Sequence, residues 1–255
     1  LGVKYIIILL LTFPALGVSA VERPNILIIL TDDQGTIDAN CYGSTDLRTP
    51  NIDRLAATGV RFTQAYAHTV CCPARAALMT GRHPQRGGVH HWTQGDMNGP
   101  DGINMALDEV TLGEALKTVG YRTALFGKWH LGHHPEVLPT SNGFDTYLGI
   151  PYSNDMNHPD NKGKPQGGAA GMDILWKDPE STLTKWKTPL IKDEEIIELP
   201  VDQRTVTRRY TQNAIDFIKK HRDESFFVYL PHSMPHIPLY VPDDVRDPNP
   251  LNAYI

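Results

Sequence analysis

A cysteine, a proline and an arginine stand at short, fixed spacing in the run Cys71-Cys72-Pro73-Ala74-Arg75. A cysteine side chain can act as a nucleophile, and an arginine guanidinium is a permanently charged partner for oxyanions. Pro73 stiffens the turn between them. The residues from Ala74 to Met79 have the pattern of a short helix that ends at Gly81. The run therefore places a thiol and an oxyanion-binding group at the beginning of one helix.

Polar side chains also follow several of the apolar runs that we expect to form strands. The clusters are Asp32-Asp33, Cys71 with Arg75, Lys128 with His130, and His232 with His236. Each has an ordinary structural explanation, such as a turn, a helix cap or a solvated loop. In open α/β sheets, however, ligands bind at the carboxyl ends of the strands. Together the clusters therefore predict one shared site.

The strands that must position these groups are short and apolar. Asn25–Leu30 and Ser225–Leu230 are continuous apolar runs, which predict strands buried on both faces. Tyr121–Phe126 and Val60–Tyr66 are predicted to be further strands. The stretch from Pro151 to about Pro200 is rich in Gly, Pro, Asn and Asp. We expect it to be a long surface excursion, with no buried strand before Ser225.

Helices are predicted between the strands. They span about Thr49–Gly59, Ala74–Met79, Thr111–Val119 and Val206–Lys220. Alternating strands and helices predict an α/β fold with a largely parallel sheet. With 40% apolar and 21% charged residues, the 255-residue chain can bury a sizeable core. Its net charge of -5 gives no electrostatic case for nucleic acid as a main partner.

The first residues have the features of a secretory signal peptide. Lys4 precedes the apolar run Tyr5–Phe13, and Val18-Ser19-Ala20 is typical of a cleavage site. We expect residues 1–20 to be this signal and the product to be exported to a periplasm, secreted or carried to a lysosome. The apolar run is too short for an ordinary membrane span, although an uncleaved anchor is the alternative. The three cysteines are too few to staple an exported domain of this size.

The run at Cys71 resembles the Cys-x-Pro-x-Arg signature of the type I, formylglycine-dependent sulfatases, which belong to the alkaline phosphatase superfamily. A second signature of that family matches Gly120–Leu131. Shorter matches lie at Thr49–Ala56 and Gly149–Asp155, and the latter is most similar to the arylsulfatase A branch. The resemblance covers the chain from Arg23 to about Pro238. It implies a large, mostly parallel sheet between helices, with residues 21–255 as the N-terminal catalytic domain.

Within that resemblance, the spacing to Pro73 and Arg75 selects Cys71 and not Cys72 for conversion to formylglycine by a formylglycine-generating enzyme. The hydrated aldehyde is a geminal diol, which can attack sulfur with one hydroxyl and release sulfate by losing the proton of the other. A plain thiolate has no such route. Asp32, Asp33 and the modified Cys71 are implied ligands of Ca²⁺, or less often of Mg²⁺.

The resemblance also assigns roles to the remaining polar residues. Arg75 orients the diol, Lys128 contacts both sulfate and diol, and His130 assists the elimination step. His236 lies near the leaving oxygen and is a candidate general acid, and Ser153 lies near the sulfate. His90, His91 and Trp92 are equally well explained as the mouth of the pocket or as a packed surface loop.

The implied activity is hydrolysis of sulfate esters, with sulfated small molecules or carbohydrates as substrates. Two alternatives remain open: a phosphonate or phosphate monoester hydrolase on the same scaffold, and an inactive, sulfate-binding relative or truncated sulfatase-like remnant. The family also uses an Asp-Asn pair, a second lysine and a smaller C-terminal domain, none of which is matched after Ile237. We therefore expect the catalytic domain to be incomplete at its C-terminal end. We also expect the 255 residues alone to be poorly stable and weakly active.

Overall fold

The computed structural model describes residues 23–89, 104–156, 183 and 186–245. These residues form a sheet with the strand order β1-β6-β2-β3-β4-β5. The strands are β1 (Ile26–Leu30), β2 (Arg122–Phe126), β3 (Thr146–Gly149), β4 (Leu190–Lys192), β5 (Glu195–Glu198) and β6 (Phe226–Pro231). The first four in this order run parallel, whereas β4 is antiparallel to both β3 and β5. The predicted α/β class with a mostly parallel sheet is confirmed.

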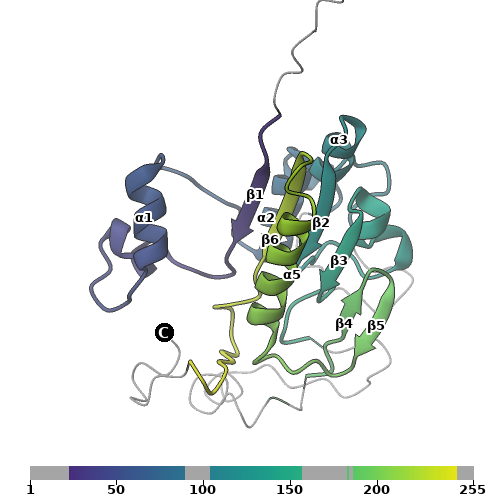
Figure 1. Cartoon of the computed structure of the whole chain (residues 1–255). Coiled ribbons are helices and arrows are strands. Elements are labelled where there is room, and N and C mark those ends of the chain that lie inside the picture. The colour runs from purple at the N-terminus through teal and green to yellow at the C-terminus, as the bar shows by residue number, and fades with distance from the viewer. Residues whose placement is uncertain (1–22, 90–103, 157–182, 184–185, 246–255) are drawn as a thin grey trace, which may run out of the picture.

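Helices cover both faces of the parallel part (Figure 1). Helices α2 (Cys71–Thr80) and α3 (Leu112–Thr118) cover one face and α5 (Val206–Lys220) covers the other, whereas α1 (Pro50–Thr58) lies apart from the sheet. One core joins Met79 of α2 and Phe144 to Leu125 and Phe227 of the sheet. The core on the opposite face joins Phe217 of α5 to other strand residues. Alternate residues of one strand thus point into different cores, as the two-residue period of a strand requires.

Local sequence explains where these helices begin and end. The hydroxyl of Thr111 accepts a hydrogen bond from the Glu114 backbone N–H at 3.1 Å, and the Glu114 carboxylate accepts one from the Thr111 N–H at 2.8 Å. This reciprocal pair is a capping box at the beginning of α3. Gly81 ends α2 in the left-handed conformation, with φ of 65°. The predicted helices 111–119 and 206–220 therefore match the structure closely.

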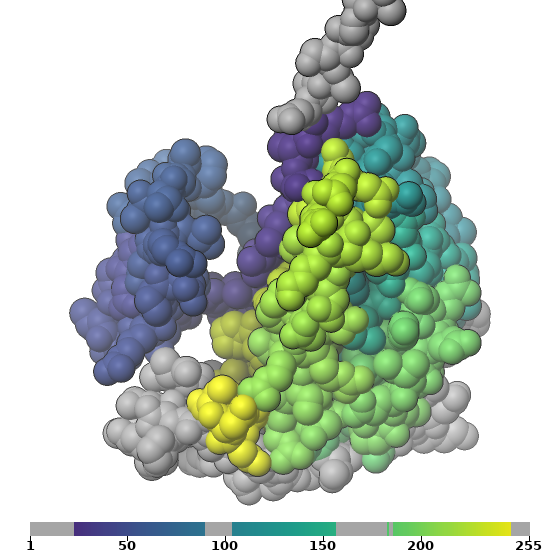
Figure 2. Space-filling model, in the orientation of Figure 1, coloured from purple at the N-terminus to yellow at the C-terminus, as the bar shows by residue number. Residues whose placement is uncertain are grey.

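Three predictions about the strands are wrong. Val60–Tyr66 forms neither helix nor strand, because no strand among the described residues pairs with this run, and Val60 and Tyr66 are 83% and 89% exposed. β1 is not buried on both faces: it lies at the sheet edge among the described residues, with Leu27 and Ile29 about half exposed. In Figure 2 the α1 segment lies as a separate lobe beside β1.

The third correction concerns the stretch from Pro151 to Pro200. Part of it returns to the sheet as the β4–β5 hairpin, in which Leu190 is fully buried. Asp193 occupies the tight turn with a φ of 55° and also accepts a hydrogen bond from the Tyr147 N–H at 2.9 Å. The hairpin is held to β3 by these long-range contacts. Its strands are too short to be recognised from their own sequence.

Glycines allow the backbone after β2 to lie close to the ends of β6 and β3 at the carboxyl edge. A Cβ at Gly127 would lie 1.9 Å from the Pro231 carbonyl oxygen, and Gly127 has a φ of 143°. A Cβ at Gly149 would lie 1.8 Å from the Gly127 carbonyl oxygen. Only glycine avoids both clashes. The close approach lets the Lys128 N–H donate to the Pro231 carbonyl at 2.7 Å, which fixes the backbone that carries Lys128.

Candidate functional site at the carboxyl edge of the sheet

The ends of four parallel strands bring distant polar residues to one edge of the sheet. Asp32 follows β1, Lys128 follows β2, Ser153 follows β3 and His236 follows β6. The first residue of α2, Cys71, joins them. The Asp32 N–H donates to the Met234 carbonyl at 3.2 Å, so the loops after β1 and β6 are joined directly. The structure thus brings members of all four sequence clusters together at the strand ends. His232 is the exception, because its ring lies 6.5 Å from that of Tyr210 in α5.

A buried charge triad lies at the centre of this edge. Oδ1 of Asp32 is 3.3 Å from Nη2 of Arg75, and Oδ2 forms an ion pair and hydrogen bond with Nζ of Lys128. The three side chains are at most 5% exposed. Arg75 also donates to the Lys128 carbonyl at 2.5 Å. Burial by itself raises the pKa of Asp32, but Lys128 and Arg75 more than offset this, so the pKa lies below its usual value.

The triad carries a net positive charge and a free donor. Two cations share one carboxylate, which leaves one positive charge in excess. Nε of Arg75 is buried and has no hydrogen-bonding partner among the described residues. A buried guanidinium donor without a partner is costly, and an oxyanion can satisfy it with matching geometry. The site is therefore suited to a small tetrahedral anion.

A second contact chain runs from the triad to the surface. Nζ of Lys128 is 3.2 Å from Oγ of Ser153, and that oxygen is 3.4 Å from Nε2 of His236. The same nitrogen of His236 is 3.7 Å from Oδ2 of Asp33, whose side chain is 62% exposed. Asp32 and Asp33 therefore differ in environment although they are neighbours in sequence. His236 thus lies between the buried triad and the exposed Asp33.

The candidate nucleophile lies beside two other potential metal ligands. Sγ of Cys71, Sγ of Cys72 and a ring nitrogen of His130 lie within 4.8 Å of one another. A hydrogen bond from Cys72 lowers the pKa of the Cys71 thiol well below its ordinary value. Burial acts in the opposite direction, and His130 and Lys128 lower the pKa further. Burial and the charge of Lys128 lower the pKa of His130, so its imidazole is neutral near pH 7.

Sequence reasoning missed the residues that support this edge from behind. The carbonyl of Asn154 accepts hydrogen bonds from Nε2 of Gln203 at 2.7 Å and from Oγ1 of Thr188 at 3.2 Å. The Asn154 side chain donates to the Pro238 carbonyl at 3.4 Å, which links the Ser153 loop to the His236 loop. All three polar residues are at most 2% exposed. Gln203 and Thr188 carry no motif, so no sequence signal identifies them.

Asp32 and Asp33 are hard oxygen donors of the kind that Ca²⁺ prefers. They can supply part of a calcium shell, which needs six to eight oxygens. Cys71 could add a ligand to the two aspartates, but in its thiol form it offers sulfur, which suits calcium poorly. An oxygen in place of that sulfur, as formylglycine provides, fits calcium better. The two aspartates and a modified Cys71 are therefore compatible with the implied metal.

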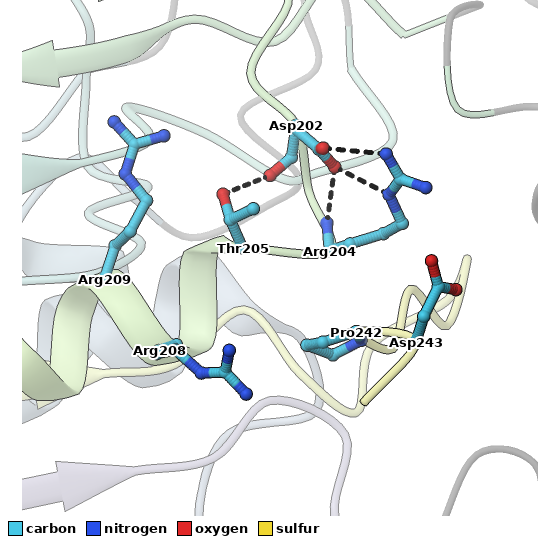
Figure 3. Close-up of a pocket in the computed structure, with 7 residues that line it drawn as sticks. All are labelled: Asp202, Arg204, Thr205, Arg208, Arg209, Pro242 and Asp243. Atoms are coloured by element: carbon cyan, nitrogen blue, oxygen red, sulfur yellow. Dashed lines mark hydrogen bonds and ion pairs between the residues drawn. The ribbon is translucent and has the colours of Figure 1, made fainter. Parts of the chain in front are cut away.

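Two cavities lie between residues of α5 and the segment that follows β6. One, of about 260 Å³, is lined by Asp202, Arg204, Thr205, Arg208, Arg209, Pro242 and Asp243 (Figure 3). Its arginines are neutralised by ion pairs: Arg204 with Asp202, Arg208 with Asp244, and Arg209 with Glu198. The other, of about 510 Å³, is mostly apolar and includes Met234 and Pro235 of the His236 loop. Neither cavity is lined by a residue of the charge triad.

Some expectations fall outside the part of the chain that the structure describes. These are the signal peptide at residues 1–20 and the pocket-mouth candidates His90, His91 and Trp92. Within the described ranges, no helix combines the length and apolar character needed to cross a membrane. Among the described residues, Cys41, Cys71 and Cys72 form no disulfide.

Comparison of the sequence with known proteins shows which family the chain resembles. The family model described as Sulfatase matches residues 24–252. Arylsulfatase G of Rattus norvegicus is 36% identical over 250 residues, which are 95% of this chain and 47% of that protein. N-acetylgalactosamine-6-sulfatase of Mus musculus is 36% identical over 91% of this chain and 44% of its own length. The chain thus spans less than half the length of these relatives.

Solved structures agree with the sequence comparison. Ps i-CgsB, crystallised in complex with k-i-k-neocarrahexaose, has a TM-score of 0.69 and 30% identity, over 88% of this chain and 48% of its own. The PsFucS1 sulfatase from Pseudoalteromonas sp. has a TM-score of 0.66 and 27% identity, over 91% of this chain and 48% of its own. Fold, strand-end site and family model agree, and the chain belongs to the sulfatase family.

Proposed function

We propose that the protein is a sulfuric ester hydrolase that acts on sulfated carbohydrates. The observation that carries this proposal is the buried triad of Asp32, Arg75 and Lys128 beside Cys71, with its excess positive charge and its unpartnered Arg75 donor. A sulfate ester has the charge and shape that such a site binds. The carbohydrate part rests on relatives: Ps i-CgsB binds k-i-k-neocarrahexaose, and another neighbour binds D-Glucosamine-2-N, 6-O-disulfate.

The chain's own residues account for binding and orientation of the sulfate. Arg75 and Lys128 hold sulfate oxygens and stabilise the negative charge that develops as the ester bond breaks. Asp32 keeps both cations in place, and its lowered pKa keeps it ionised at every pH near neutrality. When bound by Asp32 and Asp33, Ca²⁺ supplies further charge neutralisation at a sulfate oxygen. Burial of the triad excludes water that would weaken these contacts.

Proton transfer falls to the histidines. His236 donates a proton to the departing alcohol oxygen, because its Nε2 lies near Ser153 and its ring reaches towards solvent. Ser153 joins Lys128 to His236 and orients both. Neutral His130 lies beside Cys71 and accepts a proton from the modified side chain as sulfate leaves. Formylglycine at position 71 supplies, as its hydrate, the oxygen nucleophile that attacks sulfur.

The test is activity together with the chemical state of Cys71. Trypsin releases Phe62–Arg75 as one peptide, whose mass and reactivity with a carbonyl reagent show whether the thiol has become an aldehyde. We expect full-length protein from a converting host to carry the aldehyde and to cleave aryl sulfates faster than aryl phosphonates. An unmodified thiol from such a host, or faster phosphonate cleavage, contradicts the proposal.

A further inference from the structure

The sulfur and nitrogen ligands beside the triad form a group that calcium does not explain. Cys71, Cys72 and His130 each offer one soft or borderline donor, and these atoms lie within 4.8 Å of one another. Cys72 and His130 are buried, with 2% and 3% exposure. Among the described residues, these three side chains form a group of His, Cys, Asp or Glu residues that is compact enough to hold an ion.

The geometry suits a tetrahedral, thiophilic ion. Zinc binds cysteine sulfur at about 2.3 Å and histidine nitrogen at about 2.0–2.1 Å, so tetrahedral ligand atoms lie about 3.5–3.8 Å apart. The three atoms already lie within 4.8 Å of one another, so small side-chain rotations complete the arrangement. A water molecule can fill the fourth position, as in open zinc sites. Thiolates strongly favour zinc-class ions over calcium or magnesium.

The backbone holds these ligands before any ion arrives. Cys71 and Cys72 occupy the first turn of α2, whose N–H groups favour negative charge. His130 has a φ of 59°, and its N–H donates to the Pro151 carbonyl at 3.1 Å, which fixes the direction of its side chain. Lys128 and Arg75 oppose a nearby cation, but both pair with Asp32. Two thiolates also neutralise a divalent ion fully.

We propose that Cys71, Cys72 and His130 form a binding site for a zinc-class divalent ion in the protein whose Cys71 is still a thiol. Each thiol releases its proton to solvent as its sulfur binds the ion, and His130 binds in its neutral form. Oxidation of Cys71 to an aldehyde removes one of the sulfurs. The bound ion and the modified residue therefore exclude each other. The site does not depend on the substrate of the converted enzyme.

The test uses full-length protein with unconverted Cys71, verified by the mass of the Phe62–Arg75 peptide. Co²⁺ is the probe, because thiolate ligands give it a charge-transfer absorption and tetrahedral geometry gives it intense visible bands. We expect one Co²⁺ per chain, which Zn²⁺ displaces. Cys72→Ser and His130→Asn each remove a ligand. Loss of a residue that only supports a metal ligand weakens metal binding by ~10–100-fold, and we expect each of these variants to weaken Co²⁺ binding by at least as much.

The controls separate this site from casual binding by thiols. Cys41→Ser is the matched control, because Cys41 is also a free cysteine but lies in the turn Asn40–Tyr42, outside the cluster. Asparagine tolerates the left-handed backbone at position 130, and thermal unfolding verifies that each variant is folded. Equal loss of the cobalt spectrum in Cys41→Ser, no thiolate charge-transfer band, or equal affinity in fully converted protein would each overturn the proposal. If His130→Asn does not fold, Cys72→Ser alone decides.

Discussion

The charge triad predicts an unequal response to the loss of its members. Asp32→Asn leaves the buried cations Arg75 and Lys128 without their shared counter-ion, and such a loss costs about 3–5 kcal/mol. Lys128→Met instead leaves Arg75 and Asp32 as a neutral pair. It removes the charge-assisted hydrogen bond to Asp32, which is worth about 1.5–3 kcal/mol, and the longer hydrogen bond to Ser153 at 3.2 Å. We therefore expect Asp32→Asn to lower the free energy of unfolding more than Lys128→Met.

The measurement is urea unfolding at pH 7, followed by circular dichroism in the presence of a chelator so that bound metal does not contribute. Asp33→Asn is the control, because its side chain is 62% exposed and we expect a change within about 0.5 kcal/mol. If Lys128→Met is as destabilising as Asp32→Asn, or if the Asp33 variant matches the Asp32 variant, the shared-counter-ion argument is refuted.

The same triad sets a pH dependence with a definite sign. The pKa of Asp32 is lower in the folded protein than the value of 3.8 expected without the fold. Its stabilising contribution is therefore complete above the unfolded pKa and is lost as the pH falls through the folded pKa. We expect acid unfolding of Asp32→Asn to lack this component, so the stability difference from wild type shrinks below about pH 4. A constant difference between pH 7 and pH 3 contradicts this.

Three further predictions concern individual residues. Burial lowers the pKa of His232 to about 4 in the folded protein, whereas the unfolded value is about 6.5. Between these two pH values the unfolded chain therefore binds more protons than the folded protein. We expect about 3 kcal/mol of stability to be lost as the pH falls from 7 to 4, and pH-dependent urea unfolding of His232→Gln to show a flatter profile. Gln203→Met removes a buried donor to the Asn154 carbonyl. We expect it to lower kcat more than it raises KM in steady-state assays. Gln203→Glu should recover part of the activity at acidic pH, because its protonated side chain again donates a hydrogen bond. An unchanged kcat refutes the positioning role. Gly127→Ala forces a Cβ to 1.9 Å from the Pro231 oxygen, and we expect a loss of more than about 3 kcal/mol in thermal unfolding, whereas an unchanged Tm refutes the argument.

The helices and the parallel strands β1, β2 and β6 could be predicted because their signals are local, whereas the parallel strand β3 was not predicted. Thr111 and Glu114 cap a helix wherever that segment lies, and the apolar period of Val206–Lys220 needs only one face to be covered. The order of polar residues after strands also predicts their meeting at one edge, because parallel strands end on the same side. For these features, neighbouring residues contain all the necessary information.

Strand identity and burial could not be predicted in the same way. Val60–Tyr66 has strand-like composition but pairs with no strand in the described part of the chain, whereas the short β4 becomes a strand because β3 is beside it. Hydrogen bonds between strands are supplied by a partner that is distant in sequence, so composition alone does not decide the outcome. The same reason explains why Gln203 and Thr188 were missed as supports of the Asn154 carbonyl.

The candidate site also has features that the sequence determines and features that only the fold determines. Residue types and spacing identify the donors, because the charge of Arg75 and the sulfur of Cys71 belong to the side chains themselves. Which of two adjacent carboxylates is buried, and which cations it pairs with, depends on Arg75 and Lys128, which are 43 and 96 residues away in sequence. Asp32 became the shared counter-ion of Arg75 and Lys128, while Asp33 stayed exposed. Coulomb interactions depend on distance and burial, and only the folded chain sets these.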